Sequence, residues 1–233
     1  MGIGWKMVAS LENKTVLYLD FESNMKGRTF LAGFDIGDGY TTWITDDALS
    51  GWADAKGMEL ATQEDVLNLV NEADVVIAYS DSEFEVLNRW STELNIPIRK
   101  KVLYLNARKV AVAWAQKFKK SEYEALPELG VTLNKLNRPM KKSLISMIRL
   151  VGIHAWKKYG FGLVTKKLGQ VEAGLRVNLG VYSKLTRHQK MQASKVLTHN
   201  RIDIEGMKLI VETALEAMPN LHSKYAKQFG NKE

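Results

Sequence analysis

The chain has 233 residues, no cysteine, and 33 basic against 26 acidic side chains, which gives a formal net charge of +7. With 45% hydrophobic and 25% charged residues, the composition is that of a globular protein and excludes collagen-like, coiled-coil and wholly disordered chains. The lack of cysteine excludes disulfides, thiolate metal sites and cysteine nucleophiles, so any metal ligand has to be an oxygen or an imidazole nitrogen.

The sequence also lacks the features expected of a membrane protein. No apolar run approaches the roughly 18 residues that a membrane span requires, and residues 1–10 lack the long apolar stretch of a secretory signal. We therefore expect a cytoplasmic, intracellular protein with no membrane partner.

Short apolar segments separated by glycine-containing turns open the chain. Residues 15–22, 28–36 and 40–45 are rich in β-branched and aromatic side chains, which predicts an antiparallel meander of three strands. Residues 62–72 then have apolar side chains at helical spacing and begin with Thr62, a good N-cap. A helix is therefore expected to follow the meander.

Strand and helix patterns then alternate. Residues 75–78 form a short apolar run typical of a buried strand, residues 81–94 have helical periodicity, and residues 102–105 predict one more strand. Three strands in a meander followed by helix, strand, helix and strand indicate an α/β fold in which helices cover a mixed sheet.

The remainder of the chain is predicted to be helical. The expected helices cover roughly residues 107–120, 140–158, 160–170, 186–198 and 201–217. The stretches 122–142 and 169–185 are the expected irregular regions. Because no flexible linker or internal repeat is visible, we predict a single domain over residues 1–233, with a basic helical portion at residues 106–198.

Charge is divided unevenly along the chain. Residues 1–98 carry 6 basic and 17 acidic groups, residues 99–195 carry 22 and 4, and residues 196–233 carry 5 of each. Like charges at the density of the middle segment repel one another unless a polyanion or an acidic surface offsets them. Nucleic acid is the leading candidate partner. The alternative is that the basic segment docks on the acidic first part of the same chain.

The first chemical motif is Asp20-Phe21-Glu22 at the end of the first predicted strand. Alternate side chains of a strand share a face, so Asp20 and Glu22 project together. A divalent cation such as Mg²⁺ or Mn²⁺ would remove the repulsion between these carboxylates. Taken alone, the pair is also explained by a strand that runs into a solvated acidic turn.

A second acidic pair follows residues 75–78. On the predicted helix, Asp81 and Glu85 are four residues apart and share a face, so they point either to water or to a cation. Asp81 could also be an N-cap that accepts backbone hydrogen bonds.

A third group lies near the C-terminus. His199 and Asp203 are four residues apart, which places an imidazole one helical turn from a carboxylate. Histidine titrates near working pH and can deprotonate water beside a metal. The alternative is a helix cap or a surface residue.

Together, the three motifs resemble those of the DEDD superfamily of 3′ to 5′ exonucleases, which includes the proofreading domains of family-B DNA polymerases. The segment DFE at 20–22 is similar to the first motif of this family. SDSEFE at 80–85 resembles the second motif, with Glu85 where the family has aspartate, and THNRIDIEG at 198–206 resembles the third, with His199 at the tyrosine position. The chain therefore resembles a divergent member.

This resemblance implies a ribonuclease H-like fold, an antiparallel three-stranded meander plus parallel strands flanked by helices. It implies a two-metal mechanism for cleaving phosphodiester bonds of DNA or RNA from the 3′ end, with two Mg or Mn ions. The implied metal ligands are Asp20, Glu22, Glu85 and Asp203. His199 would orient or deprotonate the attacking water.

The basic segment would bind the nucleic acid through sequence-independent contacts to phosphates. The candidate nucleic-acid-binding residues are Asp81, at the position of the family's second-motif asparagine, and Lys141, Lys142, Lys157, Lys158, Lys166 and Lys167. A polymerase or another replication or repair protein is a further expected partner.

Two other functions stay open. The chain could be a catalytically weak nucleic-acid-binding subunit that keeps the nuclease fold and recruits a polymerase or a nuclease. It could also be a structural adaptor that binds an acidic protein through the basic segment. A nuclease activity that depends on a divalent metal would identify an enzyme, and its absence would favour one of these two alternatives.

Overall fold

The structure is a computed structural model that describes residues 11–23, 27–126, 142–153 and 163–229. Within these residues, a seven-stranded mixed sheet has the order β4-β3-β2-β1-β5-β6-β7. Its strands are β1 (Val16–Ser23), β2 (Thr29–Asp35), β3 (Thr41–Ile44), β4 (Glu59–Leu60), β5 (Val75–Ala78), β6 (Leu103–Asn106) and β7 (Ala226–Gln228).

The strand directions confirm the predicted meander. β1, β2 and β3 pair antiparallel, and β5 and β6 then extend the sheet parallel to β1. Two short edge strands were not predicted: β4 pairs parallel to β3, and β7 pairs antiparallel to β6. Strands of two and three residues are too short to show a detectable alternation of apolar and polar residues in the sequence.

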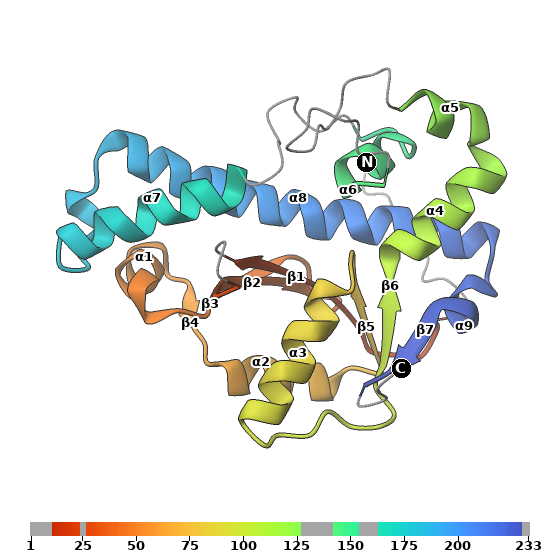
Figure 1. Ribbon diagram of the computed structural model, residues 1–233, viewed down its shortest axis with the longest axis horizontal. Helices are drawn as coiled ribbons and strands as arrows, with labels where there is room; N and C mark the ends of the chain where they lie inside the picture. The colour runs from red at the N-terminus through yellow and green to blue at the C-terminus, as the bar shows by residue number, and fades with distance from the viewer. Residues whose placement is uncertain (1–10, 24–26, 127–141, 154–162, 230–233) are drawn as a thin grey trace.

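Helices cover both faces of the sheet (Figure 1). The helical segments are η1 (Asp47–Leu49), α1 (Ser50–Lys56), α2 (Gln63–Glu72), α3 (Ser82–Glu93), α4 (Ala107–Phe118), α5 (Lys120–Ala125), α6 (Leu144–Arg149), α7 (Leu163–Val177), η2 (Tyr182–Lys184), α8 (Arg187–Ala217) and α9 (Leu221–Tyr225). One face of the sheet packs on α2 and α3, and the other packs on α4, α6 and α8. This confirms the predicted α/β class with helices on a mixed sheet.

The helix start at Thr62 is confirmed in detail. The Thr62 hydroxyl accepts the backbone N–H of Asp65, and the Asp65 carboxylate accepts the backbone N–H of Thr62, which forms a capping box. Val66 and Val70 of α2 are fully buried against the sheet. The apolar spacing that predicted the helix is therefore also the spacing that packs it.

The predicted break between helices at residues 199–200 is wrong. α8 is one helix of 31 residues that begins at a capping box formed by Thr186 and Gln189. Asparagine often marks a helix end because its side chain competes for backbone hydrogen bonds. Here Asn200 is buried and bonds to the sheet instead, so the helix continues through it.

Other helical predictions were wrong at their ends. α7 continues to Val177, well into the stretch 169–185 that was expected to be irregular. α5 likewise covers the first residues of the expected irregular stretch 122–142. Of the predicted helix 140–158, the described part forms only α6, which is followed by a turn. Among the described residues, no helix is both long enough and apolar enough to cross a membrane.

Candidate active site

The carboxylates of β1 lie on the face of the sheet that α8 covers. Leu19 packs in the core beneath α2 and α3, whereas Tyr18 packs in the opposite core beneath α4 and α8. Because side chains alternate along a strand, Asp20 and Glu22 share the Tyr18 face. The strand pattern thus presents both carboxylates to α8.

Asn200 of α8 fixes the position of Asp20. The Asn200 side chain is fully buried; its Nδ2 donates to Asp20 Oδ2 at 2.7 Å, and its Oδ1 accepts from the Tyr40 hydroxyl at 2.9 Å. Burial raises the pKa of Tyr40 to about 12, so its hydroxyl keeps the proton that it donates. A Cβ atom at Gly33 would lie 1.6 Å from Asn200 Oδ1. The missing side chain at Gly33 therefore lets the amide reach Asp20.

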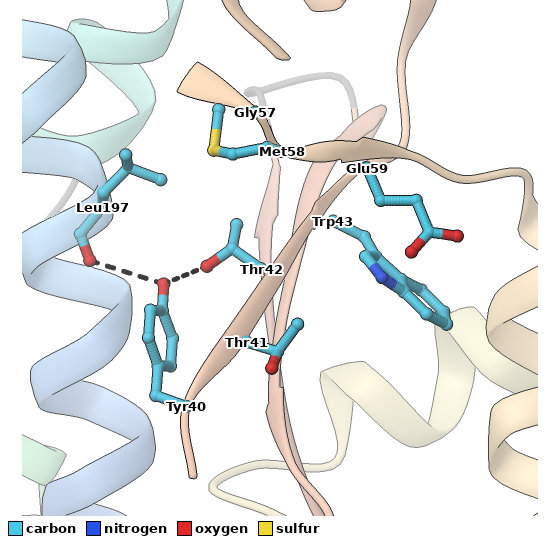
Figure 2. Close-up of a pocket in the computed structure, with 8 residues that line it drawn as sticks. All are labelled: Tyr40, Thr41, Thr42, Trp43, Gly57, Met58, Glu59 and Leu197. Atoms are coloured by element: carbon cyan, nitrogen blue, oxygen red, sulfur yellow. Dashed lines mark hydrogen bonds between the residues drawn. The ribbon is translucent and has the colours of Figure 1, made fainter. Parts of the chain in front are cut away.

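A pocket of about 450 Å³ lies beside this hydrogen-bonded pair. Its lining residues are Tyr40, Thr41, Thr42, Trp43, Gly57, Met58, Glu59 and Leu197. Figure 2 shows the Tyr40 hydroxyl between the Leu197 carbonyl oxygen and the Thr42 side chain. The pocket borders the residue that holds Asn200, but Asp20 and Glu22 do not line it.

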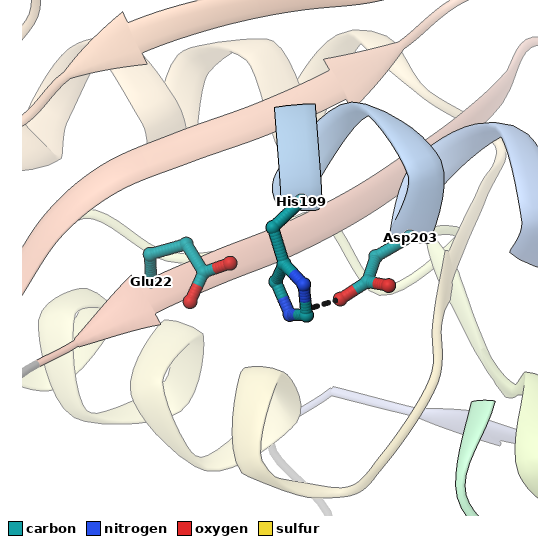
Figure 3. Close-up of side chains that lie close together, drawn as sticks. All are labelled: Glu22, His199 and Asp203. Carbon is teal, nitrogen blue, oxygen red and sulfur yellow. Dashed lines mark ion pairs between the residues drawn. The ribbon is translucent and has the colours of Figure 1, made fainter. Parts of the chain in front are cut away.

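Glu22, His199 and Asp203 form a group of side chains that could hold a metal ion. One ligand atom from each lies within 4.8 Å of the others, and the imidazole stands between the two carboxyl groups (Figure 3). The His199 Nε2 atom lies 3.1 Å from Asp203 Oδ2. Glu22 Oε1 and Asp203 Oδ1 are buried and have no hydrogen-bond partner in the described part of the chain. Two buried carboxylate oxygens thus fit the ligand set that Mg²⁺ or Mn²⁺ prefers.

The structure does not bring Glu85 to this group. Glu85 is exposed, whereas Glu83 in the first turn of α3 is only 8% exposed and raises the pKa of Asp20 and Glu22 by its negative charge. The reason is helical geometry: residues two apart point to nearly opposite faces. Leu87, four residues beyond Glu83, is buried, so the apolar stripe of α3 could have identified Glu83 from the sequence.

The carboxylates repel one another strongly without a cation. Burial, aided by the charges of Glu83 and Asp203, raises the pKa of Glu22 to about 8. Burial and the same neighbours, together with Glu22, raise the pKa of Asp20 well above its usual range against the opposing Asn200 hydrogen bond. Burial lowers the pKa of His199, but the charge and hydrogen bond of Asp203, together with the charge of Glu22, outweigh it and raise the pKa above 6.5. The site therefore favours bound positive charge, either protons or a metal ion.

Asp81 lies among cations rather than at the carboxylate group. Its carboxylate forms ion pairs with Lys227 of β7 at 2.9 Å and with Lys109 of α4 at 3.7 Å. Burial raises the pKa of Asp81, but the close contact with Lys227, the polar Asn106 side chain and the charges of Lys227 and Lys109 outweigh it and lower the pKa. As an N-cap residue of α3 it makes no capping hydrogen bond. Within the described chain, these ion pairs indicate that Asp81 has a structural role and links the start of α3 to the edge strand β7 and to α4.

The predicted basic residues are placed in part. Lys166 is exposed on α7, and Lys142 is exposed before α6, where its backbone carbonyl accepts from the Tyr79 hydroxyl at 2.8 Å. Burial and the charge of Lys195 lower the pKa of Lys167, while Glu22 opposes this shift, so Lys167 lies within electrostatic range of the carboxylates. Lys141, Lys157 and Lys158 lie outside the described residues.

Comparison of the chain with models of known protein families gives no match, and comparison with curated proteins gives none either.

Proposed function

We propose that this protein is a metal-dependent 3′ to 5′ exonuclease that cleaves phosphodiester bonds of DNA or RNA on a ribonuclease H-like fold. The observation that carries the proposal is the group of Glu22, His199 and Asp203, with ligand atoms within 4.8 Å of one another and with Asp20 and Glu83 in electrostatic range. Asp20 and Glu22 come from β1, Glu83 from α3, and Asp203 from α8. The antiparallel meander extended by parallel strands supports the fold.

The proposed metal ligands are the four carboxylates. Asp20, Glu22, Glu83 and Asp203 would hold two Mg or Mn ions, and bound ions acidify water and stabilise negative charge on phosphate and leaving oxygens. Asn200 would keep Asp20 oriented for this task through its 2.7 Å hydrogen bond. Metal binding would also offset the burial and the repulsion that raise the pKa values of Asp20 and Glu22.

His199 is the proposed proton acceptor. It stands between Glu22 and Asp203, and Asp203 fixes the orientation of the ring. An imidazole in this place can take a proton from the attacking water, because its pKa lies near working pH. Lys142, Lys166 and Lys167 would bind phosphates of the strand.

One contact favours a different function. The His199 imidazole is paired with Asp203 at 3.1 Å, so it competes with a metal ion for that carboxylate. A protein in which this pair persists would be a catalytically weak subunit that binds nucleic acid and recruits a polymerase or a nuclease.

The experiment is degradation of 5′-labelled single-stranded DNA and RNA in Mn²⁺, Mg²⁺ or EDTA. We expect the wild type to produce a ladder of shortened strands only with metal. Asp20→Asn should lower the rate about a hundredfold or more, because the metal and its ligands act mainly on the transition state. His199→Ala should have a smaller effect. Equal metal-independent background rates for the wild type and Asp20→Asn would instead support the binding subunit.

A further inference from the structure

The end of α7 has an unusual backbone cap. The Gly180 N–H bonds to the Leu175 carbonyl at 2.8 Å, and the Leu179 N–H bonds to the Arg176 carbonyl at 3.3 Å, which together form a Schellman motif. Leu179 is the left-handed residue of this motif, with φ of 53°. Glycine is the usual residue here, because a side chain at positive φ is strained.

Other helices of the described chain use favourable residues at this position. After α1 the left-handed residue is Gly57, with φ of 61°, and after α3 it is Asn95, with φ of 54°. Both residue types adopt the left-handed region readily. Leucine at the end of α7 is therefore poorly suited to its left-handed backbone conformation, and residues of this kind are concentrated at functional sites.

The strained leucine is also exposed. Leu179 is 89% exposed, Val177 is 79% exposed and Val181 is 39% exposed. We call these three residues the apolar tip. Because the strain at Leu179 is not offset by burial within the chain, the tip has the character of a contact surface for another molecule.

The loop that carries the tip is held firmly. A Cβ atom at Gly51 of α1 would lie 1.7 Å from the Gly180 carbonyl oxygen, so the two backbones are in close contact. The Asn178 side chain donates to the Gly174 carbonyl at 2.8 Å, and the Lys190 ammonium donates to the Ser183 carbonyl at 2.7 Å. The tip is therefore presented on a supported turn.

The two helices that carry the tip are strongly basic. The arm formed by residues 163–199, which contains α7 and the first part of α8, has seven basic residues and one acidic residue. The basic residues are Lys166, Lys167, Arg176, Lys184, Arg187, Lys190 and Lys195. The one acidic residue, Glu172, lies 3.9 Å from Arg28. Basic residues therefore outnumber acidic ones seven to one on the arm, a balance that attracts a polyanion.

The length of α7 sets the distance between the start of the arm and the apolar tip. Twelve residues separate Lys167 from Leu179, which corresponds to about 18 Å of helix. The start of α7 lies at the end of β1, where the Thr165 hydroxyl donates to the Ser23 carbonyl at 3.1 Å. Figure 1 shows α7 and the first part of α8 side by side, with their connecting loops at the end remote from the C-terminus. A strand stacked as in duplex DNA, with about 3.4 Å between nucleotides, covers this distance in roughly five nucleotides.

We propose that the α7–α8 arm binds a nucleic-acid strand and that the apolar tip contacts a base about five nucleotides from the cleaved bond. This inference rests on the proposed function for the position of that bond. A nucleic acid offers phosphates for the lysines and arginines and apolar base faces for Leu179, and apolar side chains that wedge against bases are a known mode of contact. The basic residues occur throughout the arm, from Lys166 to Lys195, which suits a strand better than an anionic lipid surface touching the tip alone.

The test measures binding in EDTA, so that it does not depend on hydrolysis. Fluorescence anisotropy compares single strands of about 15 and about 2 nucleotides, since the shorter strand cannot span the arm. Leu179→Asn should weaken binding of the longer strand about tenfold, the amount expected for loss of one buried leucine contact, and should change binding of the shorter strand little. The thermal midpoint should stay the same or rise, because asparagine tolerates the left-handed conformation.

The matched control is Leu94→Asn, since Leu94 is a 42% exposed leucine at the end of α3. It should leave binding of both strands unchanged. Equal affinity of the wild type and Leu179→Asn for the longer strand would overturn the proposal. A Leu179-dependent affinity for anionic phospholipid vesicles without one for the strand would also overturn it, as would Leu179-dependent self-association.

The two proposals fail separately. A strand affinity that depends on Leu179, in a protein that cleaves nothing in Mn²⁺, would refute the exonuclease and keep the arm. Cleavage in Mn²⁺ with unchanged strand binding in Leu179→Asn would refute the arm and keep the exonuclease.

Discussion

Replacing the buried amide that holds Asp20 tests the site through a residue that would not itself bind metal. Asn200→Leu keeps the approximate size of the side chain but removes the donor to Asp20 and the acceptor for Tyr40. A hydrogen bond to a charged group contributes roughly 1.5–3 kcal/mol, so the carboxylate should lose its fixed orientation. Losing such a supporting residue typically lowers metal affinity or activity about 10- to 100-fold.

Gly33→Ala reaches the same amide by a different route. The new Cβ would lie 1.6 Å from Asn200 Oδ1, so the side chain has to move although its chemistry is intact. Overpacking of this kind costs about 1–3 kcal/mol of stability. Gly206→Ala is the matched control, because its Cβ would lie 2.8 Å from an isoleucine methyl of α6, away from Asp20.

The assay combines Mn²⁺ titration with thermal unfolding. We expect Asn200→Leu and Gly33→Ala to weaken Mn²⁺ binding about 10- to 100-fold, and Gly206→Ala to lower the thermal midpoint while retaining Mn²⁺ affinity. The reasoning is refuted if Asn200→Leu folds and binds Mn²⁺ as tightly as the wild type.

Two further predictions concern charge. Metal-free protein should lose stability as pH rises from about 5 through 8. The pKa of Glu22 in the folded protein, about 8, exceeds its reference value of 4.5, so ionisation of this carboxylate costs folding free energy over that range. The raised pKa of His199 acts in the same direction, because the stabilisation that it gives is present below pH 6.5 and is lost as pH rises through its folded pKa. Thermal midpoints across pH in EDTA and in Mn²⁺ check this, and a metal-free midpoint that rises over this range would contradict it. Lys166→Glu with Lys167→Glu should weaken nucleic-acid binding and lower the log–log salt slope by about one per lost phosphate contact, whereas an unchanged slope would show that these lysines do not touch the backbone.

Strand positions and the Asp20 and Glu22 face were predictable, because alternation along a strand of eight residues is a direct consequence of backbone geometry. The helix capped by Thr62 was equally readable. These features depend on neighbours in the sequence. The edge strands β4 and β7 depend on pairing with distant residues and left no local pattern.

The site was predictable only in part, for a similar reason. Motif alignment selected Glu85, but the buried stripe through Leu87 and Trp90 places Glu83 inward. Asn200 was missed because its partners, Asp20 and Tyr40, lie 180 and 160 residues away in the chain. Its role also requires the missing side chain at Gly33, which only the register of β1 with β2 brings opposite Asp20.

The central claim is that buried carboxylates on β1, α3 and α8 form one metal-dependent hydrolytic site. The most direct test is the initial rate of cleavage of a 5′-labelled strand in Mn²⁺ by Glu83→Gln and Glu85→Gln, two substitutions of the same kind two residues apart on α3. We predict that Glu83→Gln lowers the rate about a hundredfold or more, because it removes the charge of one proposed metal ligand, and that the exposed Glu85→Gln stays within about twofold of the wild type. Equal rates for both variants and the wild type, or a loss confined to Glu85→Gln, would contradict the claim.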